Sequence, residues 1–246
     1  MISLRPQGQH AGLRRAAATH GARVLALSPL RIQHRDDAGT RAALRAALAA
    51  DVVVFTSANA VRAAAALQAL RPRRARTWLA VGAGTAAALA RAGVNDVLAP
   101  MQMDSEGLLA LPALADVRGR TIGLVTAPGG RDRLAPALRA RGAAVLRADV
   151  YARVDIAPST RALARLRTLS APRLLALSSG EALASMLAAV PDDVRLRLQR
   201  TPVLAASDRL AALARSHGFD DIEVAASARP RDLLAAGVSL AARRIR

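Results

Sequence analysis

The chain contains a long internal repeat, and this repeat constrains its fold more than any other feature. Residues 2–27 and 122–148 each read as a short apolar strand, a loop with Gly and Pro, a helix of Ala, Leu and Arg, and a second strand. The second strands align at 21–25 and 142–146, an offset of 121 residues. Solenoid repeats have periods of roughly 20–50 residues. The spacing therefore indicates two domains of one architecture, and such facing pairs commonly bind a ligand in a cleft.

Strand-like segments alternate with helical stretches of Ala, Leu and Arg along almost the whole chain. Continuous apolar segments such as 52–55 are typical of parallel sheets covered on both faces by helices. We therefore expect an α/β fold made of two flavodoxin-like, five-stranded parallel-sheet domains. The predicted strands are residues 2–5, 23–33, 52–56, 77–81, 96–99, 121–126, 144–154, 173–177, 202–206 and 221–225.

Two of these predicted strands are longer and more polar than core strands, and they occupy the same place in the repeat. Residues 23–33 and 144–154 are expected to leave their sheets and to pair as a two-stranded antiparallel linker. The first domain is then discontinuous, 1–33 with 155–246, and the second is 36–150. The alternative is two consecutive domains divided near 118–120, where the chain reads Arg-Gly-Arg.

The composition limits the function classes. All 36 basic residues are Arg and the net charge is +18, which fits either a GC-rich genome or a polyanionic partner. Nucleic-acid binding usually interleaves basic residues with aromatics, but aromatics are only 2% here. A small polycarboxylate or phosphate suits the planar guanidinium better. There is no Cys and no membrane-spanning run, and we expect no signal peptide because the first residues lack a long apolar run. We therefore expect a cytoplasmic protein. We expect a monomer because the sequence has no long exposed apolar stripe beyond what two sheets need.

Five predicted strands end in loops of small and hydroxyl-bearing residues that lead into helices. The loops lie at 56–59, 82–85, 126–131, 178–180 and 207–208. Free backbone N–H groups at a helix N-terminus can bind an anion, and open α/β sheets bind ligands along this edge. Ser, Thr, Asn and Asp are also good N-caps, so any single loop can be only a cap. Five together favour a ligand with several negative groups.

Other motifs carry less chemistry. Gly82, Gly84 and Ala87 have the spacing of a dinucleotide fingerprint, but the acidic residue expected about 20 positions later is missing. Asp104 reads instead as the cap of a helix at Glu106. The four His residues show no metal-ligand spacing. We expect neither a cofactor nor a metal.

The single tyrosine, Tyr151, lies on the predicted linker strand at the mouth between the domains. A phenol there can donate a proton to a leaving oxygen. The alternative is an amphipathic packing residue whose hydroxyl faces water.

Nine short motifs follow one another in a specific order and spacing over nearly the whole chain. They are Leu4-Arg5-Pro6, Phe55-Thr56-Ser57-Ala58-Asn59-Ala60-Val61, Val81-Gly82-Ala83-Gly84-Thr85-Ala86, Ser105-Glu106-Gly107-Leu108-Leu109, Gly129-Gly130-Arg131, Arg141-Gly142-Ala143, Val150-Tyr151, Ser178-Ser179-Gly180 and Ala225-Ala226-Ser227-Ala228-Arg229-Pro230. Taken together, these motifs resemble the uroporphyrinogen-III synthase family.

The resemblance implies cofactor-free cyclisation of hydroxymethylbilane, which carries eight carboxylates, to uroporphyrinogen III, with inversion of ring D and loss of water. It also implies two α/β domains, the first discontinuous, joined by a two-stranded ladder, and allows transient contact with the preceding pathway enzyme. Tyr151 matches the family tyrosine that assists hydroxide loss. The expected substrate-binding residues are Arg5, Ser57, Asn59, Gly84, Thr85, Arg131, Ser179, Gly180 and Ser207, with Arg5 and Arg131 chosen on electrostatic grounds.

One loop departs from the family pattern. The family often has Gly-x-x-Thr-Ala where this chain has Ala206-Ser207-Asp208, and Asp208 would repel carboxylates if it faced them. Two other functions stay open at this point. One is a non-catalytic two-domain protein that binds a small polyanion through the same loops. The other is a basic nucleic-acid-associated protein, whose affinity would fall steeply with salt.

Overall fold

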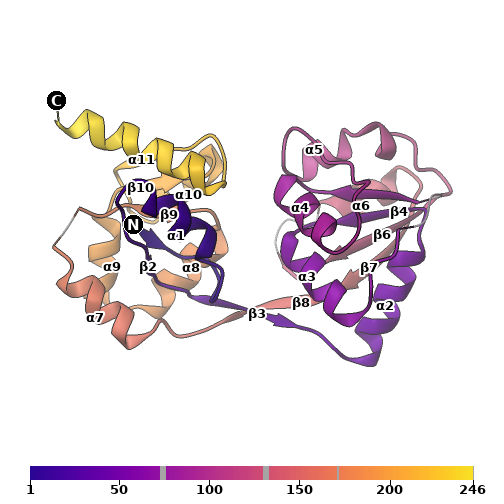
Figure 1. Ribbon diagram of the computed structural model, residues 1–246, viewed down its shortest axis with the longest axis horizontal. Helices are drawn as coiled ribbons and strands as arrows, with labels where there is room; N and C mark the ends of the chain where they lie inside the picture. Colours follow the sequence, from indigo (N-terminus) through magenta and orange to yellow (C-terminus); the bar gives the residue numbers. More distant parts are fainter. Residues whose placement is uncertain (73–75, 130–132, 171, 246) are drawn as a thin grey trace. The chain divides into compact units, whose positions relative to one another are not determined.

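A computed structural model describes residues 1–72, 76–129, 133–170 and 172–245, with side chains described up to residue 240. The chain divides into two compact units, one made of Met1–Arg31 with Val154–Arg246 and the other of Ile32–Arg153. Each unit contains a parallel β-sheet covered by helices on both faces, so the α/β fold expected from the sequence is confirmed (Figure 1). No helix in the described residues is long and apolar enough to cross a membrane.

The first unit contains a five-stranded parallel sheet. Its strands are β1 (Ile2–Ser3), β2 (Leu25–Ala26), β9 (Leu175–Leu177), β10 (Val203–Ala205) and β11 (Ile222–Val224). They lie in the order β2-β1-β9-β10-β11, which is the flavodoxin-like order 2-1-3-4-5. The chain thus builds the sheet from two separate pieces, because β1 and β2 precede the second unit and the other three strands follow it.

Helices cover both faces of this sheet because its strands alternate apolar side chains between two cores. The helices are α1 (Ala11–Ala18), α7 (Thr160–Thr168), α8 (Gly180–Ala189), α9 (Asp192–Gln199), α10 (Asp208–Ser216) and α11 (Pro230–Ile245). Leu175 and Leu177 pack in the core formed with α7, α8, α9 and α10. Ala176 and Leu204 face the opposite core, formed with α1 and α11.

The second unit contains a four-stranded parallel sheet in the order β5-β4-β6-β7. The strands are β4 (Val52–Phe55), β5 (Thr77–Ala80), β6 (Thr121–Thr126) and β7 (Ala144–Asp149). A single parallel bridge between Leu79 and Leu98 adds a fifth position beside β5. The spatial arrangement is that of the first sheet, but the chain enters at the middle strand, so this unit is a circularly permuted relative of the first.

The predicted strand at 96–99 is therefore wrong in extent, and a proline explains why. Leu98 N donates to Trp78 O at 2.9 Å and Ala80 N donates to Leu98 O at 2.9 Å. The next donor of a parallel ladder would be the backbone nitrogen of Pro100, which carries no hydrogen. The pairing stops after one bridge.

Two helical layers cover the sheet of the second unit. The helices are α2 (Ala38–Ala49), α3 (Ala58–Leu67), α4 (Ala83–Arg91), α5 (Ser105–Leu109), the 3-10 helix η1 (Pro112–Leu114) and α6 (Leu134–Ala140). The helices α2, α3 and α4 share one core with Val53 and Phe55, whereas α5, η1 and α6 share the other with Val52 and Val54. α2 crosses β6 so closely that a Cβ on Gly123 would lie 1.9 Å from a backbone oxygen of α2.

The two long predicted strands each divide in two, and their outer halves form the linker. β3 (Leu30–His34) pairs with β8 (Tyr151–Asp155) in a two-stranded antiparallel sheet, as expected. The break before β3 falls at Pro29, and β7 and β8 are separated by Val150 alone. Ile156 N donates to Pro29 O at 2.9 Å and Arg35 N donates to Val150 O at 3.0 Å, at the two ends of the ladder.

The sequence repeat is also a repeat of strand register. Ile2 pairs with Leu25 in the first unit, and Gly123 pairs with Leu146 in the second. These two pairs are related by the same offset of 121 residues that relates the sequences. The repeat therefore encodes the strand–helix–strand unit that brings two neighbouring parallel strands together in each sheet.

Candidate functional site

Each sheet has one place where the helices that follow neighbouring strands pass to opposite faces. In the first unit β1 leads to α1 on one face and β9 leads to α8 on the other. In the second unit the same relation holds for β4 with α3 and for β6 with α6. In open α/β sheets the carboxyl ends of such strands flank the ligand crevice. A ligand site of either unit is therefore expected at this edge.

In the second unit, Ser57 connects this edge to the tyrosine. Its Oγ caps α3 by accepting a hydrogen bond from Ala60 N at 3.0 Å, and it lies 3.1 Å from the Tyr151 hydroxyl. The Tyr151 ring packs in the α2–α3–α4 core and the residue is only 3% exposed. The tyrosine is thus a buried residue with its hydroxyl on a helix N-terminus, rather than a packing residue with its hydroxyl in water.

Arg153 also reaches the tyrosine hydroxyl. Its Nη1 lies 3.5 Å from the Tyr151 hydroxyl oxygen, and its Nη2 donates to Pro128 O at 2.9 Å. Pro128 belongs to the loop between β6 and α6, and α6 lies on the opposite face of the sheet from α3. Tyr151 and Arg153, both on β8, therefore connect the start of α3 with the loop that follows β6.

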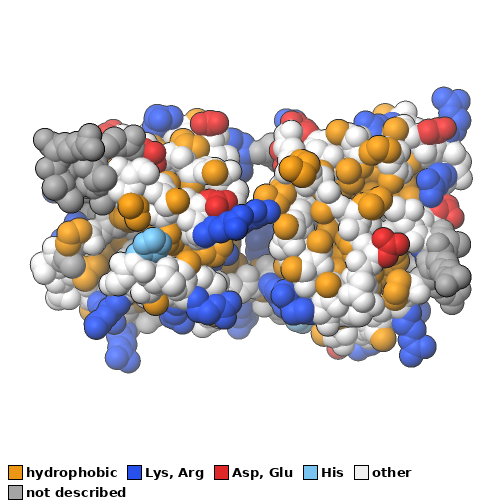
Figure 2. Space-filling view, turned by 45° about the horizontal axis from the view of Figure 1, so that its top comes forward, with side chains coloured by type: hydrophobic (Ala, Val, Ile, Leu, Met, Phe, Trp, Pro, Cys, Tyr) orange, Lys and Arg blue, Asp and Glu red, His pale blue; other side chains and the backbone are white. Residues whose placement is uncertain are grey.

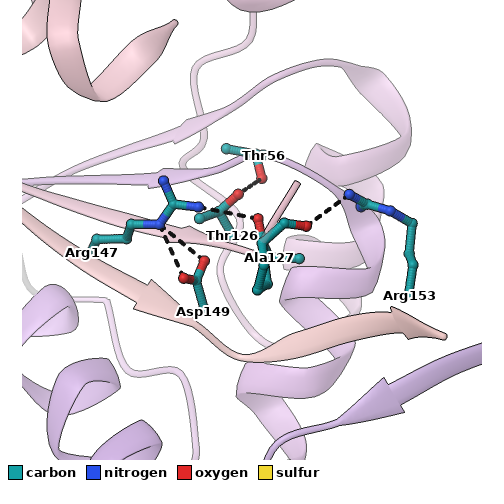
Figure 3. A network of polar contacts seen from close by, with 7 residues as sticks. Thr56, Thr126, Ala127, Arg147, Asp149 and Arg153 are labelled. Carbon is teal, nitrogen blue, oxygen red and sulfur yellow. Dashed lines mark hydrogen bonds and ion pairs between the residues drawn. The ribbon is translucent and has the colours of Figure 1, made fainter. Parts of the chain in front are cut away.

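A second arginine holds the same loop from another direction. Arg147 on β7 donates through Nη2 to Ala127 O at 3.3 Å and forms an ion pair with Asp149, with Nε 3.1 Å from Oδ1. Figure 3 shows Arg147 and Arg153 approaching the loop from two sides, with the Thr56–Thr126 hydroxyl contact above it in this view. The loop backbone is thereby anchored at two successive carbonyls.

The other expected residues of the second unit that the structure describes lie near helix starts. Asn59, in the first turn of α3, accepts through Oδ1 from Arg62 on the same helix. Gly84 is exposed in the first turn of α4, and Thr85 is buried there at 5% exposure. Burial, together with nearby Arg91, lowers the pKa of the Arg62 guanidinium. Arg131 lies outside the described residues.

In the first unit, a buried histidine binds two serines at the same edge of the sheet. His10, 4% exposed, lies with Nδ1 3.0 Å from Ser3 Oγ and Nε2 2.8 Å from Ser28 Oγ. Burial, with Arg14 and Arg5 nearby, lowers the pKa of His10. Arg5 donates through Nη2 to Ala228 O at 3.0 Å, and burial lowers the pKa of its guanidinium too. Arg5 is thus tied to the loop that precedes α11.

Ser179 and Ser207 are N-caps, as the simpler interpretation of their loops predicts. Ser179 Oγ accepts from Ala182 N at 3.2 Å, and Ser207 Oγ accepts from Leu210 N at 3.4 Å. A Cβ at Gly180 would lie 2.5 Å from Leu213 Cδ2 of α10, so the Leu213 side chain would have to shift. Asp208 is exposed in the first turn of α10, where an acidic side chain suits the helix dipole.

Among the predicted residues, the structure brings Ser57 and Tyr151 together. Sequence reasoning missed Arg153, which contacts Tyr151 in the second unit. It also missed the His10–Ser28 contact in the first unit. A signal for Arg153 was present, because side chains two residues apart on a strand share a face. No comparable signal marked the His10–Ser28 contact.

Part of the arginine excess has a structural role. Arg76 donates to Leu48 O at the carboxyl end of α2, and Arg197 donates to Leu166 O near the end of α7. Cations are favourable at this end of a helix. Figure 2 shows basic side chains at separate places on the visible face of both units rather than in one stripe. This distribution does not favour a nucleic-acid track.

A family model for uroporphyrinogen-III synthase HemD matches residues 12–235. The chain belongs to this family. The Salmonella typhimurium uroporphyrinogen-III synthase is 34% identical over 187 residues, 72% of this chain and 74% of that protein. The Escherichia coli uroporphyrinogen-III synthase is 33% identical over 153 residues, 61% of this chain. The match spans 62% of the length of the Escherichia coli protein.

Two solved structures share the fold. One is a mutant uroporphyrinogen III synthase from Thermus thermophilus, with a TM-score of 0.65, 21% identity and coverage of 98% of both chains. The other is the Helicobacter pylori uroporphyrinogen-III synthetase, with a TM-score of 0.60, 14% identity and coverage of 97% of this chain and 98% of that chain. At these identities the likeness supports the two-unit α/β architecture of the family alone.

Proposed function

We propose that this chain is a uroporphyrinogen-III synthase, which closes hydroxymethylbilane into uroporphyrinogen III with inversion of ring D and release of water. Family membership gives the reaction class. The observation that carries the proposal is the Tyr151 hydroxyl, held 3.1 Å from the Ser57 Oγ that caps α3 at the ligand-binding edge of the second unit. A phenol fixed in this way can act as a general acid.

In the proposed reaction Tyr151 donates its proton to the terminal hydroxyl of the substrate. The carbon–oxygen bond breaks, water leaves, and the electron pair of the pyrrole forms an azafulvenium cation. The substituted carbon of the last pyrrole attacks this cation, giving a spiro intermediate that fragments and recloses with ring D inverted. A proton lost from the substrate on aromatisation restores the phenol, so the sequence is balanced without a cofactor.

The carboxylates of the substrate require hydrogen-bond donors or positive charges. Each unit has residues at its proposed ligand-binding edge that can supply them. The proposed substrate-binding residues are Ser57, Asn59, Gly84, Thr85 and Arg131 in the second unit and Arg5, Ser179, Gly180 and Ser207 in the first. All three serines occupy N-cap positions, where the remaining free N–H groups of the helix favour an anion. The net charge of +18 gives a polycarboxylate a favourable field.

Most of the rate is proposed to come from positioning. Spontaneous closure without inversion gives the type I isomer, so the protein must hold the chain ends in the geometry that leads to the spiro intermediate. Orientation of reacting groups can supply roughly 7–11 kcal/mol of a barrier. Oriented backbone amides that stabilise distributed charge would add to this effect.

We further propose that the protein acts as a cytoplasmic monomer and makes at most transient contact with the enzyme that supplies hydroxymethylbilane. The proposed domains are 1–33 with 155–246 and 36–150, close to the two compact units. A reactive linear substrate that closes spontaneously to the wrong isomer gives a reason for such a handover.

The test is a coupled assay in which hydroxymethylbilane is generated in situ, the protein is added, and the oxidised uroporphyrin isomers are separated by chromatography. Predominantly type III product is expected, and Tyr151→Phe should lose much of the activity while its circular dichroism spectrum is unchanged. Only type I, as in the protein-free blank, would refute the synthase. If tetrapyrrole binding were measured alongside that result, the non-catalytic polyanion-binding protein would replace it.

A further inference from the structure

We infer that Arg153 is a positioning residue for the proposed reaction. Its guanidinium stabilises the Tyr151 hydroxyl oxygen as the proton leaves, and the same guanidinium donates a hydrogen bond to the Pro128 carbonyl. This inference rests on the proposed function, because it assigns a role within that site. It concerns a residue that none of the sequence motifs had marked.

Strand geometry places the two side chains together. Tyr151 and Arg153 are two residues apart on β8, so they lie on the same face of the strand. The Arg153 Nη1 is 3.5 Å from the tyrosine oxygen. At this separation the contact is a weak hydrogen bond, but the guanidinium charge still acts over it.

Donor and acceptor counting gives this contact a direction. A guanidinium has N–H donors and no acceptor, so the tyrosine oxygen must be the acceptor toward Arg153. Ser57 Oγ already accepts from Ala60 N, and its own hydrogen stays free to rotate. When Tyr151 gives up its proton, Ser57 and Arg153 can both donate to the phenolate oxygen. The contact with Arg153 is present before the reaction and strengthens as negative charge develops on the oxygen. It therefore stabilises the transition state more than the ground state.

The second contact of Arg153 ties the phenol to the loop that follows β6. Nη2 donates to Pro128 O at 2.9 Å, and every described peptide bond is trans. The carbonyl and the following N–H of a trans peptide point in opposite directions. Anchoring Pro128 O therefore turns the Gly129 N–H away from the arginine. Gly129 has φ +77°, a backbone conformation that favours glycine, and a Cβ there would lie 3.3 Å from Nη2.

Arg147 provides a matched control within the same network. It donates to the adjacent carbonyl of Ala127 and pairs with Asp149, but neither of these contacts involves Tyr151. Replacing Arg147 by Gln thus loosens the loop and removes one positive charge, as Arg153→Gln does, and leaves the phenol's neighbours in place.

The experiment is a double-mutant cycle. Arg153→Gln and Arg147→Gln are each made in the native chain and in Tyr151→Phe, and kcat and KM are measured in the coupled assay after matched folding by circular dichroism. We expect Arg153→Gln to lower kcat by about tenfold or more with KM changed less than about threefold. In the Tyr151→Phe background the same change should lower kcat by less than about threefold, because the phenolate is no longer formed. Arg153→Lys, which keeps a charge, should recover part of kcat.

Several results would overturn the inference. They are an equal effect of Arg153→Gln in both backgrounds, an effect on KM alone, or an effect no larger than that of Arg147→Gln. If Arg153→Gln fails to fold, the comparison is made with Arg153→Lys, whose positive charge lies at a different distance from the phenol. Arg153→Lys should then lower kcat in the native chain but not in Tyr151→Phe. An unchanged kcat in the native chain would refute the role.

A readout without substrate separates this inference from the proposed function. The chain has a single tyrosine, so selective ¹³Cζ labelling gives one resonance that reports on the phenol. Arg153→Gln should move this resonance and Arg147→Gln should leave it near its native position. A native protein that makes only type I product refutes the synthase and with it any catalytic role of Arg153. An unmoved resonance in an active protein refutes the role of Arg153 alone.

Discussion

Replacing Ser57 by Ala removes two interactions of one hydroxyl. The Oγ accepts from Ala60 N at 3.0 Å and lies 3.1 Å from the Tyr151 hydroxyl. Loss of an N-cap costs about 1 kcal/mol, and loss of a hydrogen bond to a buried hydroxyl costs about another 1 kcal/mol. We therefore expect the free energy of unfolding to fall by about 2 kcal/mol, which lowers the thermal midpoint by roughly 4–8 °C for a chain of this size.

The same substitution should affect turnover more than this loss of stability explains. With Ser57 gone, the tyrosine hydroxyl loses the contact that directs it, and misplacement of a reacting group lowers rates steeply. We expect kcat to fall by about tenfold or more under conditions where the variant is fully folded. Ser57→Thr keeps the hydroxyl in an extended backbone that threonine readily adopts (φ −164°, ψ 158°), and it should retain both stability and turnover.

A second cap in the same unit is the control. Asp37 caps α2 by accepting from Thr40 N at 2.8 Å, and no contact described here connects it to Tyr151. Asp37→Ala should lower the thermal midpoint and leave kcat close to the native value. The measurements are urea and thermal unfolding for each variant and initial rates of type III formation. If Ser57→Ala lost no more turnover than Asp37→Ala, the argument that Ser57 orients the phenol would be wrong.

Three further predictions concern stability. Gly123→Ala places a Cβ 1.9 Å from Ala47 O, so α2 must shift and unfolding should become easier by about 3 kcal/mol or more; an unchanged urea midpoint would refute the close crossing. Arg141 Nη1 donates at 2.7 Å to carbonyls at the ends of α5 and η1, and Arg141→Gln should cost about 3 kcal/mol in the same assay. Burial, with two nearby arginines, holds the pKa of His10 below 6.5; the unfolded chain therefore binds a proton that the folded chain does not as the pH falls below 6.5. The free energy of unfolding should therefore fall as the pH is lowered below 6.5. The measurement is the urea midpoint between about pH 8 and about pH 5, which should depend less on pH in His10→Gln than in the native chain.

The sequence was most informative where the structure is local. The repeat predicted a strand–helix–strand unit in each domain, and capping was the simpler interpretation of the loops at Ser57, Ser179 and Ser207, which all cap helices. Asp104 caps α5 as expected, accepting from Gly107 N at 2.8 Å. Such features depend on residues within a few positions of one another, so periodicity and side-chain type suffice to find them.

The sequence was least informative where contacts join distant segments. Ser57 and Tyr151 are 94 positions apart, and no pattern in either segment specifies their distance. The His10–Ser28 contact depends on which face α1 occupies. The predicted strand at 96–99 is shortened to one bridge because Pro100 lacks an N–H. This matters only because the segment pairs with β5, which the sequence alone does not show. These details follow from packing, which composition and spacing alone do not fix.

The discontinuity of the first unit has a consequence for the order of events during synthesis. The second unit is one uninterrupted segment, Ile32–Arg153, so it can fold once that segment has left the ribosome. In the first unit β1 can pair with β2 early, but its other neighbour, β9, begins only at Leu175. When the second unit is complete, the nascent chain therefore carries an apolar β1–β2 pair whose remaining neighbour has not yet been translated. Since domains generally fold as units during translation, the early helix α1 and strand β1 form the segment most in need of protection by a chaperone.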